Sequence, residues 1–525
     1  MTRLITSLIA ALTVASIQAQ VPANEMPKLV VGITIDQLRG DYLELFKYSF
    51  SERGFKRLLN EGLVYDNLKF DFPNVDDASA IATIYTGTTP YYHNVVGRKR
   101  YIAKKGQEEQ TYLDGEFLGN YSQEKLSPLA LKTSNIIDEL KAASSGLSDA
   151  YVFAVDASQA LGVGGRSANC AFWVDDHTGQ WASTTYYRDF YWVVDQENRG
   201  NNSNIVRGWG KFWTPLERKS YNALPYVSGT VSFQHNFGTD KNTYNLFKHS
   251  PLVNQSVVDI ATKLLESAEL GKRATPDFLG LTFYAGGYPE CGDYSIEIQD
   301  LYARLDKQIE KLIDEVDKKV GLQNALFFVT STGYYNYSDR PNKAYPDFGT
   351  FYVNRCEALL NMYLMAIYGE GQWVDKFYNK QIYLNRKLVE NKELSLKEVQ
   401  QKAAEFVSDF SGVQDVYTSY QLRHGEWNSV MEYYKNGYTV NSSGDLFIEI
   451  QPGYKVVNEQ DATLKTKIAR NNAVVCPVIF YGCGIKPERI RRTIKATEIA
   501  PTVSHILRIR PPTGATEQPL REIFK

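Results

Sequence analysis

Residues 28–35 read KLVVGITI, a nearly unbroken run of β-branched and apolar residues that stops at Asp36. Such a run is typical of a strand buried on both faces, because a strand with one solvent face would alternate with polar residues. Similar runs recur at 150–155, 278–284, 325–330 and 473–482. Segments with helical periodicity lie between them, at 46–61, 134–143, 251–268, 295–320 and 496–507. This alternation predicts a doubly wound α/β fold with a mostly parallel sheet flanked by helices.

Two long stretches interrupt the alternation. From 158 to 249, Gly, Asn, Trp and Tyr become dense and helical periodicity fades, which predicts an aromatic-rich cap of loops and short strands. Residues 341–453 are predicted to form a second insertion, with a charged helix at 395–410. The α/β core is then expected to comprise 24–157, 250–340 and 454–525. The tryptophans of the first insertion are expected in its interior or, where exposed, on a face that binds a partner: Trp173, Trp181, Trp192, Trp209 and Trp213.

The N-terminus has the pattern of a secretory signal. One basic residue, Arg3, precedes a mostly apolar run from Leu4 to Ile17, and Ala19 offers a small residue for cleavage. This run is too short to span a bilayer as a stable anchor, and no later segment has 18 continuous apolar residues. We therefore expect residues 1–19 to be a signal peptide. The mature chain is expected in the periplasm or at the periplasmic face of an outer membrane, without a transmembrane segment.

Charge and cysteine spacing exclude two further classes. The chain has 58 Lys and Arg against 60 Asp and Glu, a net charge of −2, whereas a nucleic-acid binder needs a basic surplus to neutralise phosphates. The five cysteines include no CxxC pair, which argues against a zinc ribbon or a redox pair. Buried thiols are expected, with a Cys476–Cys483 bridge as the alternative.

Several motifs resemble the alkaline phosphatase superfamily, in its phosphate-monoesterase and nucleotide pyrophosphatase/phosphodiesterase branch. The motifs are ATIYTGTTP at 82–90 with His93, SIEI at 295–298 before LDK at 305–307, QIYLNRKL at 381–388, PVIFYG at 477–482 before GIKP at 484–487, and EIAPT at 498–502. Their order and spacing extend from about residue 28 to 520. The resemblance implies an alkaline-phosphatase-like α/β fold.

The resemblance also implies a chemistry. In this family two zinc ions, about 4 Å apart, clamp the attacking and leaving oxygens of a phosphoryl transfer. Asp and His side chains bind the zinc ions, and a Thr or Ser alkoxide attacks phosphorus.

Position by position, most of this machinery is replaced. The first metal-ligand Asp of the family corresponds to Asp36 and is kept, while the nucleophilic Thr falls on Asp77. Five of the six metal ligands fall on residues that bind zinc poorly: Ala285, Pro289, Thr332, Gly333 and, for the last His, a position near Thr466. No metal cofactor is therefore expected.

The groups that hold phosphate in this branch are replaced as well. The family Asn falls on Arg98, and the family Lys and Arg fall on Asp156 and Ser158. Carboxylates at Asp77 and Asp156 would repel a phosphate dianion. Losing a single oxyanion donor already costs about 3 kcal/mol of transition-state stabilisation, so these changes together predict loss of the family's reaction.

Three features keep alternatives open. Asp36, Asp76 and Asp77 could form a weak Ca²⁺ or Mg²⁺ site, could serve as helix caps and solvated carboxylates, or could offer Asp77 as an acyl-phosphate nucleophile. The basic run 98–100 is either a solvated loop or an anion contact in place of the lost clamp. The six histidines show no HxH or HxxxH spacing, and ordinary core or surface positions are expected for them.

Three functions are compatible with these residues. The first is a catalytically inactive member, a pseudo-phosphatase with a binding or scaffold role in an envelope complex and therefore a protein partner. The alternative is an active metal-dependent phosphomonoesterase or phosphodiesterase with a rearranged site. A third is a glycan- or nucleotide-binding protein, for which the aromatic-rich insertion is the cue.

Overall fold

The structure is a computed structural model of the 525-residue chain. It describes residues 26–188, 190–200, 212–216, 232–238, 242–289, 291–338, 348–425, 428–460 and 467–524. The predicted signal peptide, Trp209 and Thr466 lie outside the described residues.

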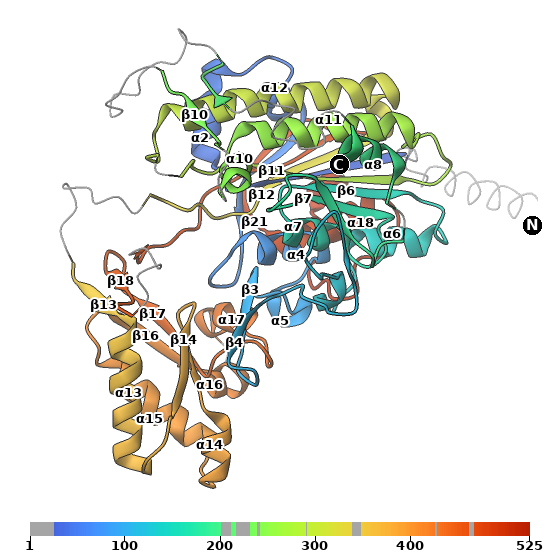
Figure 1. The fold of residues 1–525 in the computed structure, drawn as a ribbon. Helices are drawn as coiled ribbons and strands as arrows, with labels where there is room; N and C mark the ends of the chain where they lie inside the picture. Colours follow the sequence, from blue (N-terminus) through green and yellow to red (C-terminus); the bar gives the residue numbers. More distant parts are fainter. Residues whose placement is uncertain are drawn as a thin grey trace, which may run out of the picture.

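A ten-stranded sheet runs through the molecule in the order β21-β2-β20-β12-β1-β11-β6-β7-β8-β5 (Figure 1). Its strands are β21 (Glu488–Lys495), β2 (Leu63–Lys69), β20 (Val478–Gly482), β12 (Ala325–Ser331), β1 (Leu29–Asp36), β11 (Asp277–Tyr284), β6 (Ala150–Ala154), β7 (Cys170–Val174), β8 (Trp181–Thr184) and β5 (Gly119–Asn120). All of them except β20 and β8 point in one direction, so the predicted α/β fold is confirmed, with a mixed sheet. The carboxyl ends of β1, β11, β12 and β6 consequently meet at one edge.

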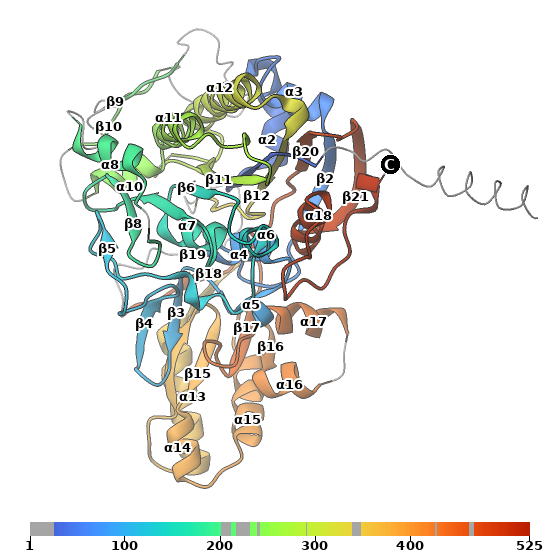
Figure 2. The same cartoon turned by 90° about the vertical axis from the view of Figure 1, so that its right-hand side faces the viewer.

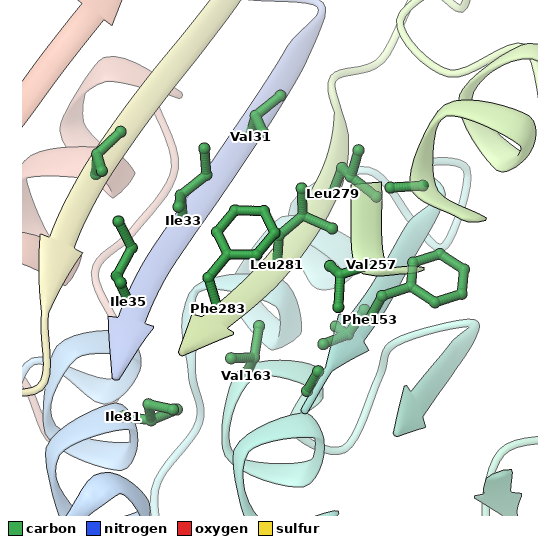
Figure 3. Packing of buried hydrophobic residues seen from close by; sticks show 14 of the residues in the cluster. Val31, Ile33, Ile35, Ile81, Phe153, Val163, Val257, Leu279, Leu281 and Phe283 are labelled. Atoms are coloured by element: carbon green, nitrogen blue, oxygen red, sulfur yellow. The ribbon is translucent and has the colours of Figure 1, made fainter. Parts of the chain in front are cut away.

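Helices cover both faces of the sheet, as Figure 2 shows end-on. One face is covered by α11 (Pro251–Ser267) and α12 (Ile296–Lys319). The other carries α4 (Asp77–Thr86), α6 (Ile136–Ala143), α7 (Ala157–Gly164) and α18 (Ile499–Ile506). Buried aliphatic and aromatic side chains of β1, β11 and β6 pack between these layers (Figure 3).

Glycines in two central strands let the helices approach closely. A Cβ on Gly32 of β1 would lie 2.7 Å from the Phe328 ring and 3.0 Å from the Tyr85 hydroxyl of α4. A Cβ on Gly280 of β11 would lie 2.5 Å from Val163 of α7. The α4 and α7 helices therefore sit near the strands, which brings their N-termini to the edge where β1 and β11 end.

The predicted first cap differs from the structure at its start. Helix α7 and strands β7 and β8 belong to the main layers, although they fall inside the range 158–249. Part of the high aromatic content of this range belongs to the main sheet, because Trp173 of β7 and Trp181 of β8 are each 1% exposed. The rest of the range contains α8 (Trp192–Arg199), the two-stranded ribbon of β9 (Phe212–Trp213) and β10 (His235–Asn236), and α10 (Thr243–Lys248). Trp213 is buried, whereas Trp192 is exposed.

A second unit projects from the side that carries α4 and α5 (Pro90–His93) (Figures 1 and 2). Its antiparallel sheet, β14-β15-β17-β16, and its helices enclose a hydrophobic core separate from that of the main sheet. Its elements are α13 (Val353–Tyr368), β14 (Val374–Tyr378), β15 (Gln381–Leu384), α14 (Arg386–Asn391), α15 (Leu396–Ser408), β16 (Val413–Thr418), α16 (Ser419–His424), α17 (Ser429–Asn436) and β17 (Leu446–Ile450). A small sheet of β13 (Thr350–Tyr352), β18 (Lys455–Val457) and β19 (Lys467–Ile468) lies beside it.

Two predicted boundaries were wrong. The range 46–61, expected to be one helix, contains only a short 3-10 turn at Lys47–Ser49 and α3 (Phe55–Glu61), which begins after its N-cap Gly54. A separate helix, α2 (Gly40–Leu45), lies before this range. The strand expected at 473–482 is shorter in the structure, where β20 begins at Val478. A hairpin of β3 (Lys99–Ile102) and β4 (Gln107–Gln110) follows α5. The five cysteines, all in the described residues, form no disulfide. Four of them are buried as expected, whereas Cys291 is partly exposed. Across the described ranges, no helix is both long and apolar enough to cross a bilayer.

Candidate active-site pocket

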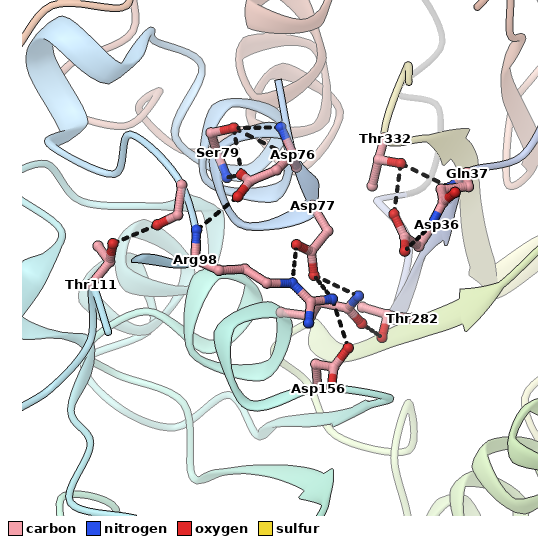
Figure 4. A network of polar contacts seen from close by, with 12 residues as sticks. Asp36, Gln37, Asp76, Asp77, Ser79, Arg98, Thr111, Asp156, Thr282 and Thr332 are labelled. Atoms are coloured by element: carbon pink, nitrogen blue, oxygen red, sulfur yellow. Dashed lines mark hydrogen bonds and ion pairs between the residues drawn. The ribbon is translucent and has the colours of Figure 1, made fainter. Parts of the chain in front are cut away.

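Polar side chains gather where the central parallel strands end (Figure 4). Asp36 is the last residue of β1, Thr332 follows β12, and Thr282 lies near the end of β11. Asp77 opens α4 next to them, and Asp156 precedes α7. The structure thus brings together Asp36, Asp77, Asp156 and Thr332, which are far apart in the sequence.

The sequence Asp76-Asp77-Ala78-Ser79 builds the start of α4. Asp76 is the N-cap, and its carboxylate accepts a hydrogen bond from the Ser79 amide at 2.9 Å. The Ser79 hydroxyl accepts in return from the Asp76 amide at 3.0 Å, which completes a capping box. Of the alternatives for this cluster, helix capping is confirmed at Asp76. The solvated carboxylates suggested with it are wrong for Asp36 and Asp77, because both side chains are buried. Asp77 lies in the first turn, where the helix dipole favours a negative charge.

Arg98 clamps the carboxylate of Asp77. Its Nε donates to Oδ1 of Asp77 at 2.5 Å, and its Nη2 donates to Oδ2 at 2.7 Å. The same Nη2 reaches Oδ2 of Asp156 at 2.7 Å. The Asp77 side chain is completely buried, whereas the Arg98 side chain is 47% exposed. Arg98 therefore covers a buried carboxylate and bridges it to a second one.

Lys248 extends this network from the other side. Its Nζ donates to Oδ1 of Asp156 at 2.9 Å and also pairs with Asp176. Burial raises the pKa of Asp156, but the charges of Arg98 and Lys248 lower it more strongly, and the net pKa lies well below the ordinary value. The network thus alternates in sign, with three carboxylates and two cations.

A hydrogen-bonded relay joins Asp77 to the sheet. Gln159 of α7 donates from Nε2 to Oδ2 of Asp77 at 2.8 Å, and its Oε1 accepts from the Thr282 hydroxyl at 2.7 Å. Thr282 in turn accepts from the Val155 amide at 3.0 Å. Both oxygens of Asp77 are therefore occupied by donors from this chain.

Asp36 lies beside the network in a different environment. Its Oδ1 accepts from the Thr332 hydroxyl at 2.9 Å, and that hydroxyl accepts from the backbone N–H of Gln37 at 2.9 Å. Burial, together with the nearby charge of Asp77, raises the pKa of Asp36 to about 7, although Arg98 and Thr332 act in the opposite direction. Asp36 therefore carries a proton more readily than an ordinary carboxylic acid.

The other residues predicted for this pocket occupy various positions. Ala285 is buried and its amide donates to the Asp36 carbonyl at 2.9 Å. Gly333 follows Thr332 with a φ of +73°, and a Cβ there would meet the Phe70 ring at 2.3 Å. Ser158 is in the first turn of α7, and Pro289 is in the loop after β11.

His93 does not belong to the pocket. Its Nε2 is 3.1 Å from the Thr83 hydroxyl, and its Nδ1 accepts from the Val95 amide at 3.1 Å. Burial lowers its pKa to about 3, so His93 is a neutral core histidine, as expected.

The pocket residues do not fit the pair of zinc ions that the resemblance implies. Zinc in a catalytic site needs about three protein ligands per ion. Here Asp36 is accompanied by Thr332, Gly333 and Ala285, and the Asp77 carboxylate is engaged by Arg98 and Gln159. Among the described residues, the one group of three His, Cys, Asp or Glu ligand atoms within 4.8 Å of one another lies elsewhere, at His235, Cys291 and Glu297.

Comparison with known proteins confirms the family. Residues 30–472 match the model of type I phosphodiesterase / nucleotide pyrophosphatase. The chain belongs to this family. It is 27% identical over 530 residues to the alkaline phosphatase PafA of Elizabethkingia meningoseptica, with 95% of this chain and 94% of the relative covered. It is 29% identical over 540 residues to a protein of Myroides odoratus named calcium-transporting ATPase, with 95% of each covered. The crystal structure of wild-type PafA superposes with a TM-score of 0.80 at 24% identity, covering 96% of this chain and 100% of that one, which confirms the fold.

The sequence did not reveal Gln159 or Lys248 as pocket residues. Gln159 is a single amide in an apolar helix, AxQALGVG, where a buried polar residue implies a partner. Lys248 falls inside the predicted cap, about 90 residues from Asp156, and no local pattern links the two. The one available signal was Asp156 itself, because a carboxylate that becomes buried needs a cationic partner.

Proposed function

We propose that this family member is a non-catalytic phosphatase homologue whose substrate pocket is closed by its own ion pairs. The observation that carries the proposal is the Asp77–Arg98–Asp156 bridge. By the resemblance, Asp77 stands where relatives hold the nucleophile, and Asp156 stands where they hold a phosphate-binding Lys. Arg98 takes the position between them that a phosphate would need.

Charge in the pocket supports the same proposal. Within the part of the chain that the structure describes, Asp77, Asp156 and Asp176 are paired with two cations, Arg98 and Lys248. The neighbouring Asp76 accepts from the backbone amide of Arg98 and adds a further carboxylate. A phosphate dianion entering here would meet carboxylates at short range, where each uncompensated like charge costs several kcal/mol at the effective dielectric of a partly buried site. It would also have to displace Arg98 from a bidentate contact with Asp77.

An intact fold around such a pocket favours a role in binding. The strands that frame the pocket are fully buried and regular, so the scaffold is kept although the pocket has changed. With the signal-like N-terminus, this supports a scaffold protein of the cell envelope that acts through a protein partner. Crosslinking in native envelopes should return a stoichiometric partner, and a chain that remains monomeric there would contradict this part of the proposal.

The catalytic part is tested with aryl phosphate monoesters and diesters, assayed with and without added zinc. We expect no turnover above that of a preparation in which Asp36→Asn replaces the remaining family ligand. Turnover that needs zinc and disappears with Asp36→Asn would overturn the proposal and show a working, rearranged site.

Occupancy of the pocket is tested separately. Inorganic phosphate should produce no heat of binding with the native chain. The matched variant Asp77→Thr/Arg98→Asn/Asp156→Lys restores the residue types of the relatives, and we expect it to bind phosphate measurably. Equal phosphate binding by both chains would mean that the ion pairs do not close the pocket.

A further inference from the structure

Three potential metal ligands converge at a place distinct from the pocket described above. His235 comes from β10, Cys291 from the loop after β11, and Glu297 from the first turn of α12. One ligand atom of each lies within 4.8 Å of the other two. We propose that His235, Cys291 and Glu297 bind one zinc ion.

The ligand atoms already share hydrogen bonds. His235 Nε2 is 2.9 Å from Oε1 of Glu297, and the Cys291 side chain also bonds to Glu297. Zinc bonds to nitrogen, oxygen and sulfur are about 2.0–2.3 Å long, and three such atoms around one ion lie about 3–4 Å apart. Only small side-chain movements are needed.

The surroundings of His235 are those of a built site. Three aromatic rings enclose the imidazole, with centroids 4.3 Å away for Tyr288, 5.2 Å for Phe233 and 5.3 Å for Trp213. Trp213 is anchored in turn, because its Nε1 donates to Asp300 of α12 at 2.7 Å. The His235 side chain is nevertheless 22% exposed, which leaves a path for an ion.

The ligand set selects the class of metal. A thiolate and an imidazole favour zinc and similar borderline cations over Ca²⁺ and Mg²⁺, which prefer oxygen. Three protein ligands leave a fourth position for water. An ion here would join the β9–β10 ribbon to the start of α12.

The position in the loop is notable because of the resemblance. The relatives' Asp and His ligands of the segment after β11 fall on Ala285 and Pro289 here. Cys291 lies two residues beyond Pro289 in the same loop. The segment thus lacks that pair of ligand types and carries a thiol two residues further on.

Metal binding is measured on the purified chain by equilibrium dialysis with Zn²⁺ and elemental analysis, and by Co²⁺ substitution, in which a bound thiolate gives a charge-transfer absorption. We expect one equivalent of Zn²⁺, a thiolate–Co²⁺ band, and a rise in Tm with added Zn²⁺. Cys291→Ser and His235→Gln should each weaken binding about 100-fold or more and remove the Tm rise. Cys483→Ser, which removes a thiol far along the chain, and Asp36→Asn should leave all three readouts unchanged.

The proposal is overturned if no equivalent of Zn²⁺ is retained, or if binding survives both Cys291→Ser and His235→Gln. It is equally overturned if Asp36→Asn abolishes binding, because the ion would then be in the pocket of the relatives. The metal-free Tm of each variant shows whether it folds, and His235→Gln decides the matter should Cys291→Ser be unfolded. None of these readouts depends on phosphatase activity, so they separate this inference from the proposed function.

Discussion

Replacing Arg98 with Met tests the closed pocket directly. The substitution keeps the apolar stem and removes the guanidinium, which leaves the buried carboxylate of Asp77 with Gln159 as its remaining side-chain donor. Breaking a buried ion pair from one side costs about 3–5 kcal/mol. Arg98 is 47% exposed, so water can partly replace it, and we expect a loss of about 2–3 kcal/mol in the free energy of unfolding.

The loss should depend on pH. Arg98 opposes the rise in the pKa of Asp36, so without it that pKa rises further above the ordinary value of 3.8. A carboxyl whose pKa is raised in the folded state destabilises the fold as pH rises from the ordinary pKa toward the raised one. The deficit of Arg98→Met relative to the native chain should therefore be largest near pH 8 and shrink toward pH 4.

The assay is equilibrium urea unfolding followed by circular dichroism, arranged as a double-mutant cycle with Asp77→Asn. Asp77→Asn removes the charge that Arg98 neutralises, so the double variant should recover most of the stability lost in Arg98→Met. We expect a coupling free energy of about 2 kcal/mol. A coupling near zero, or a deficit independent of pH, would refute the reasoning.

Three further predictions concern single side chains. Asp36→Asn should raise the free energy of unfolding by about 2 kcal/mol at pH 8, since the folded pKa of about 7 exceeds the unfolded value of 3.8, and the gain should vanish near pH 4 in thermal melts. Gln159→Leu should cost about 2 kcal/mol in urea unfolding, because it leaves Asp77 and Thr282 without their shared partner, whereas the exposed control Gln401→Leu should change little. His93→Gln should lower the free energy of unfolding at pH 7.5, and its difference from the native chain should narrow as pH falls below about 6. Burial lowers the pKa of His93 to about 3, so the native chain takes up a proton at this site when it unfolds and loses stability in acid, which the variant does not. A difference that stays constant across the range would contradict this.

The fold could be predicted because its signals are local. Long buried runs such as 28–35 need only the burial of both faces of a strand, and all eight residues of β1 are buried as that pattern predicts. The first insertion was harder to delimit, because β7 and β8 are short and aromatic. Trp173 and Trp181 were assigned to the first insertion from the sequence, but they pack in the main core.

Side-chain contacts in the pocket could be predicted only in part. The resemblance groups Asp36, Asp77, Arg98 and Asp156 in one site, and the structure joins Arg98 to Asp77 and Asp156. Whether Arg98 would lie in solvent or in the pocket depended on a contact between residues 21 and 58 positions apart, which no local pattern encodes.

The same limit applies to His235. Spacing rules look for ligands on one helix or strand, and His235 is 56 residues before Cys291 in the sequence. Only the register of the β9–β10 ribbon and the turn after β11 bring these side chains together. Ligand sets built from three separate segments are therefore invisible to a search for short motifs.

The alternating charges of the pocket constrain the route by which such a chain can evolve. If an ancestor held the neutral and basic groups of its relatives, an aspartate arriving first at 77 would have been buried without a counterion, and one arriving first at 156 would have had Lys248 alone. A guanidinium arriving first at 98 would have been tolerated, because its half-exposed side chain remains hydrated. Arginine is thus the permissive first step, and once both aspartates are in place, a single return substitution at any of the three positions is penalised, which makes the change hard to reverse.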